Sequence, residues 1–403
     1  MSRPTAFVNG RQCIHGKLVR QNLYVSPEGE IIDPVHHQQA DNQQPPSLAE
    51  LYNVIDLNDA VIAPGFLELQ INGAYGFHFT HFTGATAYVD NVHQLAKQLP
   101  KHGVTGFYPT IPTVTKDVFQ KGLPFLKPAA HHLDEASVLG AHVEGPFLAP
   151  SKKGAHDAAH MHIPAATTLE SVYREENLKD AIKIVTLAPE LPGALDHIET
   201  LTKKYGIKVS MGHSAATNAE GLQGMKAGAS LLTHTFNAMN PLHHREPGLI
   251  GLISSPSPPY FSLIADKIHL HPDVVVLAYR SAPSHCILIT DSIELAGCAD
   301  GLYPGHSQVP FNQRKVGNMV TIEGTNTLIG TCISLDECVR NLKTWAEISI
   351  EEAVMCVTEH VADAMGLKDR GKLEVGRRAD LVILDDDGNV KDTWIKGQLV
   401  SRS

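Results

Sequence analysis

The distribution of apolar residues changes at residue 61 of this 403-residue chain. From there, short apolar runs alternate with longer stretches of helical spacing, such as 87–99 and 195–205. The eight runs that we predict as strands are 61–69, 104–108, 138–143, 182–187, 207–211, 231–235, 261–265 and 286–290. Because strands that alternate with helices form parallel sheets, this pattern predicts an α/β fold, a (β/α)₈ barrel of the TIM type.

The two ends of the chain have a strand pattern of their own. Residues 1–60 contain short β-rich runs, and after about residue 370 the segment GKLEVGRRADLVILDDDGNVKDTWIKGQLV contains further strands around a turn at 386–389. We therefore predict that residues 1–62 and 370–403 form one small β-sandwich domain and that residues 63–369 form the barrel. The polar, Gln-rich segment 35–47 predicts a solvated loop.

Composition narrows the class of protein. A hydrophobic fraction of 43% with 19% charged residues is typical of a globular protein with a substantial core. The net charge of −10 and the lack of a basic run argue against nucleic-acid binding. No apolar run reaches the roughly 18 residues of a membrane span. The N-terminal MSRPTAFVNG does not resemble a signal peptide, and the six cysteines are scattered, so we expect a reducing, cytoplasmic setting.

Three polar residues follow or end predicted strands, and they suggest a metal site. Glu144 ends VLGAHVE, His213 follows IKVSMG, and His234 ends LLTH. In a β/α barrel the carboxyl ends of the strands meet on one face, so these side chains are expected to converge there. A carboxylate and two imidazoles with open positions are typical of a catalytic divalent-metal site. The alternative is that each histidine is structural, in a chain that contains 23 of them.

Further candidates for chemistry lie at other strand ends and in loops. Asp291 follows CILIT, where it can act as a general acid/base or simply cap the next helix. His269 follows SLIAD and is a candidate donor to a carbonyl oxygen, with His271 as a competitor. Arg245, in HHREPG, is either an anion clamp or an exposed loop residue.

At these residues the sequence resembles the N-acetylglucosamine-6-phosphate deacetylases of the amidohydrolase superfamily. The matching segments include APGFLELQINGAYG at 63–76, HVEGPFLAPSKKGAH at 142–156, SMGHS at 210–214, LLTHTFNAMNPLHHREPG at 231–248, LIADKIHLHP at 263–272, ILITDSI at 287–293 and TLIGT at 327–331. The combination of EGPF, KGAH, THTFNAM and HHREPG is more specific than any one motif, and it extends over nearly the whole chain.

The resemblance implies hydrolysis of N-acetylglucosamine 6-phosphate to glucosamine 6-phosphate and acetate. Glu144, His213 and His234 would hold one divalent metal ion per subunit, with zinc favoured and iron, cobalt or manganese suitable as alternatives. Asp291 would be the general acid/base and His269 would stabilise the oxyanion. Many superfamily members bind a second metal through H-x-H in the first barrel strand. This chain has Gln70 and Asn72 there, and amides are poor ligands for transition metals, which favours a single metal.

The resemblance also implies a set of substrate contacts. They are Ala155, His156, Asn237, Ala238, Arg245, Asp266, His269, Leu328, Ile329 and Gly330. In such enzymes the arginine reaches the phosphate in the neighbouring subunit's site, so a homodimer is expected, with a small amino-sugar phosphate as the substrate and with no nucleic acid or membrane as a partner.

The chain departs from the family pattern in loops that are expected to line the substrate pocket. Lys267 and Ile268 replace a glycine and a small residue, and Ile329 replaces a serine. These changes bear on sugar selectivity more than on the type of reaction. Two alternative functions therefore remain: a related metal amidohydrolase acting on another N-acyl sugar or a cyclic amide, and a non-catalytic relative that binds a sugar phosphate.

Overall fold

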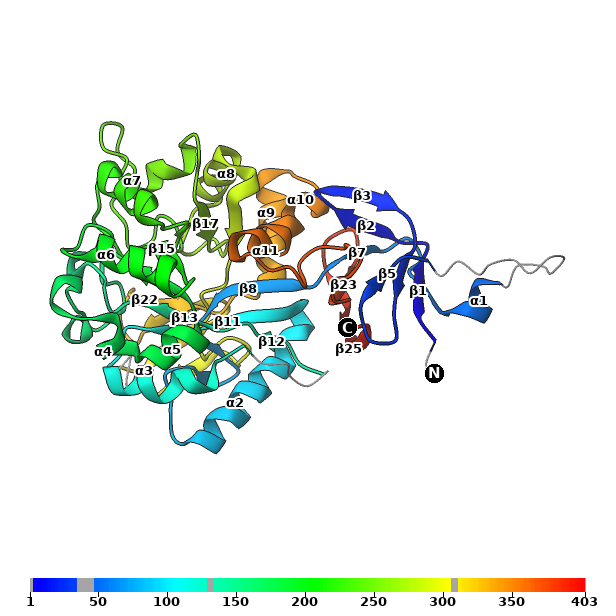
Figure 1. Cartoon of the computed structure of the whole chain (residues 1–403), viewed down its shortest axis with the longest axis horizontal. Coiled ribbons are helices and arrows are strands. Elements are labelled where there is room, and N and C mark those ends of the chain that lie inside the picture. Colours follow the sequence, from blue (N-terminus) through cyan, green and yellow to red (C-terminus); the bar gives the residue numbers. More distant parts are fainter. Residues whose placement is uncertain (1–2, 35–46, 129–133, 306–310, 403) are drawn as a thin grey trace.

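The computed structural model describes residues 3–34, 47–128, 134–305 and 311–402, and its main body is the predicted barrel. The predicted loop at 35–47 lies, except for Ser47, outside the described residues. Neighbouring barrel strands are parallel, and the barrel is nearly closed (Figure 1). The strands are β8 (Phe66–Ile71), β11 (Val104–Pro112), β13 (Ala141–Glu144), β14 (Ile182–Leu187), β15 (Lys208–Met211), β16 (Leu231–Leu232), β17 (Tyr260–Leu263) and β18 (Cys286–Leu288).

The last strand meets the first just beyond their hydrogen-bonded ladders. An isolated parallel bridge pairs Ile71 with Ser292, and the Asp291 N–H donates to the Gln70 carbonyl at 2.9 Å. The prediction of the barrel is confirmed, although some strand ends differ from it. The predicted strand 231–235 is only Leu231–Leu232, because the chain leaves the strand before His234.

Helices pack around the barrel and bury one face each. In α2 (Ala85–Gln98) the buried residues Tyr88, Val92, Leu95 and Ala96 recur at helical spacing, so they form one apolar stripe. The other long helices are α7 (Asn218–Ala227), α8 (Pro272–Ser281) and α9 (Leu335–Ala346), with shorter ones in α3 (Lys116–Gly122), α4 (Leu169–Tyr173), α5 (Glu175–Asp180), α6 (Ala194–Glu199), α10 (Ile350–Met355) and α11 (Glu359–Met365).

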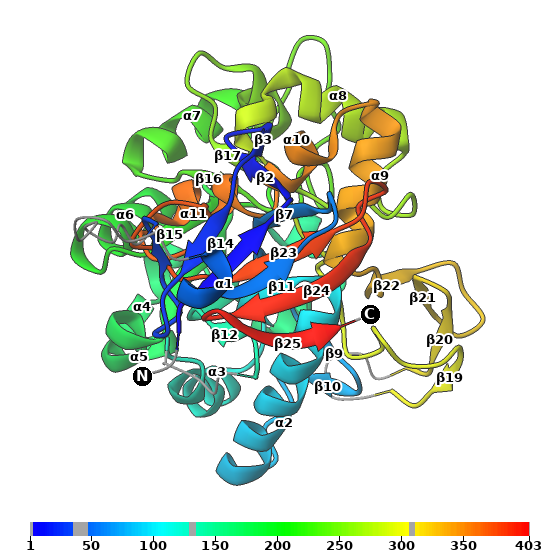
Figure 2. The same ribbon diagram turned by 90° about the vertical axis from the view of Figure 1, so that its right-hand side faces the viewer.

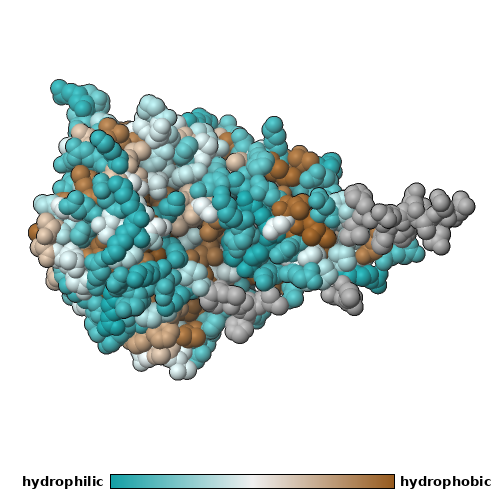
Figure 3. All heavy atoms as spheres, viewed as in Figure 1, coloured by the Kyte–Doolittle hydropathy of each residue, from teal (hydrophilic) through white to brown (hydrophobic). Residues whose placement is uncertain are grey.

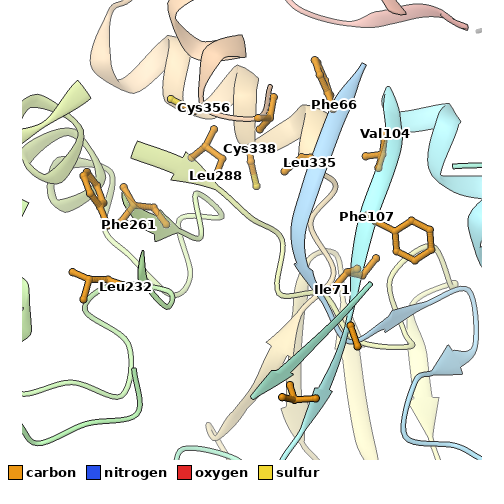
Figure 4. Close-up of a cluster of buried hydrophobic side chains, with 14 of the residues drawn as sticks. Phe66, Ile71, Val104, Phe107, Leu232, Phe261, Leu288, Leu335, Cys338 and Cys356 are labelled. Carbon is orange, nitrogen blue, oxygen red and sulfur yellow. The ribbon is translucent and has the colours of Figure 1, made fainter. Parts of the chain in front are cut away.

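The core fills the space between the barrel strands and these helices. Figure 4 shows Phe66 on β8 and Phe107 on β11, with Leu335 and Cys338 on the α9 side of the same cluster. All four side chains are buried. The strands are therefore held in place by apolar packing as well as by their ladders.

The two chain ends meet in a six-stranded sheet of order β25-β24-β23-β7-β2-β3 (Figure 2). β7 (Val61–Pro64) pairs antiparallel with β23 (Leu381–Leu384), which joins residues far apart in the sequence. The remaining strands are β2 (Arg11–Ile14), β3 (Lys17–Arg20), β24 (Val390–Ile395) and β25 (Gln398–Arg402). A second sheet of order β5-β4-β1-β6 comprises β1 (Thr5–Val8), β4 (Leu23–Val25), β5 (Ile31–Ile32) and β6 (Asn53–Asp56).

The predicted strand 61–69 is wrong in one respect, because it is two strands. Strand pairing is interrupted at Gly65, so β7 belongs to the terminal sheet and β8 to the barrel. A Cβ at Gly65 would lie 2.2 Å from Thr105 Oγ1, so the close approach of β11 requires glycine there. The proposed division at residues 62 and 370 stays a prediction.

A four-stranded sheet that was not predicted lies between the last barrel strand and α9. This inserted sheet has the order β19-β20-β21-β22, with β19 (Gly301–Tyr303), β20 (Gln313–Val316), β21 (Met319–Ile322) and β22 (Leu328–Thr331) (Figure 2). β20 and β21 form a hairpin around Gly317 and Asn318. The buried and exposed positions alternate along β20, as in a sheet with one face against the protein.

Across the described ranges, no helix is both long enough and apolar enough to span a bilayer. Figure 3 shows a face on which hydrophilic residues predominate and apolar residues are mixed among them.

Candidate active site

Three of the predicted site residues come from the carboxyl ends of barrel strands. Glu144 is the last residue of β13, and His213 and His234 follow β15 and β16 by two residues each. Both histidines have a left-handed backbone, with φ of 48° and 29°, which is uncommon outside glycine and typical of functional sites. A Cβ at Gly212 would lie 2.7 Å from the Cβ of Thr233, so glycine is needed where these two strand ends approach.

The three side chains converge closely on one another. Glu144 Oε1 lies 3.0 Å from His234 Nε2 and 3.3 Å from His213 Nε2, and the two Nε2 atoms are 3.1 Å apart. In the parts of the chain that the structure describes, this is the one group of three or more His, Cys, Asp or Glu side chains that could hold a metal ion. The predicted ligand set is thus brought together, and all three residues are buried.

The surroundings of this cluster fit a cation. His213 Nδ1 lies 2.8 Å from the Lys152 carbonyl, which requires a proton on Nδ1 and makes Nε2 the ring atom directed at Glu144. Burial disfavours the charged form of Glu144, but hydrogen bonds from His213 and His234 outweigh it and hold the pKa of Glu144 well below its usual value. Burial likewise opposes the charge of His234, yet Glu144 raises the pKa of that imidazole to about 9. A cluster that retains a proton so strongly has the negative potential that a divalent cation requires.

Asp291 lies beside this cluster and is held by two amides. Its Oδ1 accepts from Asn72 Nδ2 at 2.7 Å and from Gln70 Nε2 at 3.1 Å, and Gln70 Nε2 is also 3.1 Å from Glu144 Oε1. Burial, followed by the charge of Glu144, raises the pKa of Asp291 to about 6. The helix-cap alternative fails, because the next element along the described chain is the strand β19.

His269 is oriented by a buried carboxylate. Its Nδ1 lies 2.7 Å from Asp266 Oδ2, while Asp266 Oδ1 accepts the backbone N–H groups of Ile268 and His269, each at 2.8 Å. Because Nδ1 is engaged, Nε2 is the ring atom that can meet a ligand. The competitor His271 is instead the N-cap of α8, where its ring accepts from the Asp273 N–H.

These groups line one cavity of about 400 Å³. His156, which also lines it, accepts the Thr113 N–H at Nδ1 (3.1 Å), so its ring proton is on Nε2, 3.7 Å from Glu144 Oε2. Burial, followed by the neighbouring His213, lowers the pKa of His156 to about 3, so this ring is a neutral hydrogen-bond donor. The other predicted contacts that line the cavity are Ala155, Asn237, Ala238, His269, Leu328, Ile329 and Gly330.

Some predicted contacts lie elsewhere. Asp266 is behind His269, and Arg245 is exposed in the loop before Gly248. Lys267 and Ile268 do not line the cavity either, contrary to expectation, since Lys267 has a φ of 64° and an exposed side chain.

Besides Asn72, four polar residues of the cavity wall were not among the predicted site residues. They are His78, Glu294, Gln313 and Thr327. Gln313 belongs to the inserted sheet, whose one readable signal was the alternation of QRKV before the Gly-Asn turn.

A nearly closed parallel barrel with a buried Glu/His/His cluster at its carboxyl end defines a class of protein, the metal-dependent barrel hydrolases. The sequence model of the amidohydrolase family matches residues 61–400. The chain is 36% identical over 406 residues to the N-acetylglucosamine-6-phosphate deacetylase of Bos taurus, covering 98% of this chain and 95% of that protein. It is 37% identical over 354 residues to that of Caenorhabditis elegans, covering 86% and 84%.

A solved structure agrees with these matches. The N-acetylglucosamine-6-phosphate deacetylase from Pasteurella multocida superposes with a TM-score of 0.83 at 26% identity, covering 99% of this chain and 100% of that one. The chain belongs to the amidohydrolase family and, within it, to the family of the N-acetylglucosamine-6-phosphate deacetylases.

Proposed function

We propose that this protein hydrolyses N-acetylglucosamine 6-phosphate to glucosamine 6-phosphate and acetate. One observation carries the proposal: Glu144, His213 and His234 converge beside Asp291 in one cavity. The full-length similarity to deacetylases of that substrate gives the sugar phosphate as the ligand.

Glu144, His213 and His234 are the proposed metal ligands. When bound, the metal would supply Lewis acidity that activates water and polarises the amide carbonyl. A carboxylate and two imidazoles suit zinc best among common metals, with iron, cobalt and manganese as alternatives. We propose one ion per subunit, because the Gln70 amide N–H groups bond to both Glu144 and Asp291 and offer a cation no lone pair.

Asp291 is the proposed general acid/base. The hydrogen bonds from the side-chain amides of Gln70 and Asn72 both end on Asp291 Oδ1. Oδ2 is therefore the oxygen that can exchange protons with a reactant. It takes a proton from the attacking water and delivers it to the departing amine. With Nδ1 engaged by Asp266, His269 can direct Nε2 toward the carbonyl oxygen, where charge develops.

The cavity wall provides the proposed substrate contacts, and a second subunit completes them. Ala155, His156, Asn237 and Ala238 lie on the metal side, and Leu328, Ile329 and Gly330 on the inserted sheet. Arg245 is exposed and outside the cavity of its own chain, so we propose a homodimer in which it binds the phosphate in the neighbouring site. Six free cysteines fit a reducing, cytoplasmic setting.

The test is acetate release from N-acetylglucosamine 6-phosphate, with metal analysis of the same sample. We expect turnover and one divalent ion per subunit. His213→Ala is the matched control and should lose both the metal and the activity. A metal-loaded protein that releases no acetate from this substrate would overturn the proposed function.

A further inference from the structure

The cavity has a second polar wall, apart from the metal cluster. Gln313 and Glu294 line it, and neither belongs to the metal cluster or to the contacts proposed above. Gln313 is 1% exposed and Glu294 5% exposed. Because burying an amide group costs free energy unless it is bonded, the amide of Gln313 in the cavity wall calls for a partner at each of its polar atoms.

The orientation of the Gln313 amide follows from its neighbour. Gln313 Nε2 donates to Glu294 Oε1 at 3.0 Å. A carboxylate oxygen accepts only, so the amide nitrogen must face Glu294 and the amide oxygen must face away from it. Gln313 Oε1 is buried and receives no hydrogen bond from the described residues.

The backbone holds both residues in these positions. The Glu294 carbonyl accepts the Gly76 N–H at 2.7 Å. Gln313 pairs with Tyr303 on one side and Ile322 on the other, in the middle of the inserted sheet. The acceptor at Oε1 is therefore preorganised rather than carried on a mobile loop.

The chemistry of this wall selects the part of a sugar phosphate that it can bind. An amide oxygen beside a carboxylate accepts hydrogen bonds from hydroxyl groups, whereas a phosphate dianion offers no donor and is repelled by a carboxylate. A ring hydroxyl is the matching group. The phosphate must then lie toward another part of the cavity.

Resting on the proposed function, we propose that Gln313 is a specificity-determining residue whose Oε1 accepts a hydrogen bond from one ring hydroxyl of the sugar. Glu294 is the positioning residue that orients the amide. The inserted sheet thereby contributes to the selection of the sugar, while the reacting groups lie at the ends of the barrel strands.

The test combines a change in the Gln313 side chain with the removal of single hydroxyl groups from the substrate. We would measure kcat/KM of the metal-loaded protein and of Gln313→Leu for N-acetylglucosamine 6-phosphate and its 1-, 3- and 4-deoxy analogues. In the wild type, one analogue should lose about tenfold, the value of one neutral hydrogen bond. In Gln313→Leu, kcat/KM for the parent sugar phosphate should itself be about tenfold lower than in the wild type. The analogue that was affected in the wild type should then have the same kcat/KM as the parent sugar phosphate.

Two further variants guard against trivial outcomes. Arg314→Leu changes the neighbouring exposed residue of β20 and should leave every analogue penalty as in the wild type. Glu294→Leu removes the acceptor that orients the Gln313 amide. It should therefore reduce the loss of kcat/KM for the same deoxy analogue that Gln313→Leu affects. Metal content should be unchanged in all three variants.

If each deoxy analogue loses as much kcat/KM in Gln313→Leu and in Glu294→Leu as it does in the wild type, the inference about Gln313 is overturned, but the proposed function is not. A wild type that is inactive on the parent sugar phosphate would overturn the proposed function instead. The two failures are therefore distinguishable.

Discussion

The two walls of the cavity are built in different ways. On the barrel wall, the four polar side chains stand at the ends of strands that pack against a buried core; they are Glu144, His213, His234 and Asp291. The strands β13, β15 and β16 are each paired on both sides. The other wall comprises Glu294 and one face of the inserted sheet, whose opposite face exposes Leu302 (49%) and Val316 (53%).

Under the proposed roles, this difference separates the groups that react from the groups that select the sugar. The reacting groups must keep their mutual geometry within fractions of an ångström, and the barrel provides this through its ladders and core. The inserted sheet is attached at one edge of the cavity, so its residues can differ between relatives without moving the reacting groups. Ile329, a departure from the family pattern, belongs to this second wall.

The largest expected effect tests the barrel wall. Asp291→Asn keeps the size and the amide contacts of the side chain but removes its capacity to carry a proton. We expect kcat to fall by roughly 10²- to 10⁴-fold with unchanged metal content. Steady-state kinetics with metal analysis checks this, and normal turnover would remove Asp291 from the mechanism.

A second prediction asks whether the two walls of one chain are sufficient. Arg245→Ala should lower kcat/KM for the phosphorylated sugar by roughly 10- to 100-fold, the value of hydrogen bonds to a charged group, and leave an unphosphorylated N-acetyl sugar unaffected. Mixing Arg245→Ala with Asp291→Asn subunits should restore activity, since one site of each mixed dimer then has both groups intact. If mixing restores nothing, Arg245 does not act across subunits.

The pH profile gives a smaller effect that belongs to the barrel wall alone. Burial and the Glu144 charge raise the pKa of Asp291 to about 6, and the base form is required for attack. Activity should therefore be full above this pKa and should fall about tenfold per pH unit below it. In Gln313→Leu the same inflection should appear, because the second wall carries no reacting proton. A profile flat down to pH 4 would contradict this assignment.

The smallest effect concerns stability. Leu263→Ala, in barrel strand β17, removes a fully buried side chain and should lower the free energy of unfolding by about 2–5 kcal/mol. Leu302→Ala, on the exposed face of the inserted sheet, should change it by less than about 0.5 kcal/mol. Denaturant titration of the two variants compares the walls directly, and equal losses would show that the insert is as integral to the core as the barrel is.

Much of the barrel wall could be predicted because its information is local. An apolar run followed by a polar residue marks a strand end, and parallel strands bring such ends together, so Glu144, His213 and His234 were identifiable as one set. Asp291 was ambiguous from its position, since an aspartate after a strand can also cap a helix. The absence of a helix at that point in the described chain excluded the cap, and the acid/base role stays a proposal.

The sequence by itself therefore determined the fold class and the family of this protein, and it identified the three side chains that converge as a candidate metal site, because strand periodicity and specific motifs are properties of short segments. Tertiary structure alone decided that β7 leaves the barrel, that Lys267 points away from the cavity and that the inserted sheet brings Gln313 against Glu294. Each of these depends on which distant segment lies alongside. Such long-range pairing is the outcome of packing the whole chain, and no short stretch of residues encodes it.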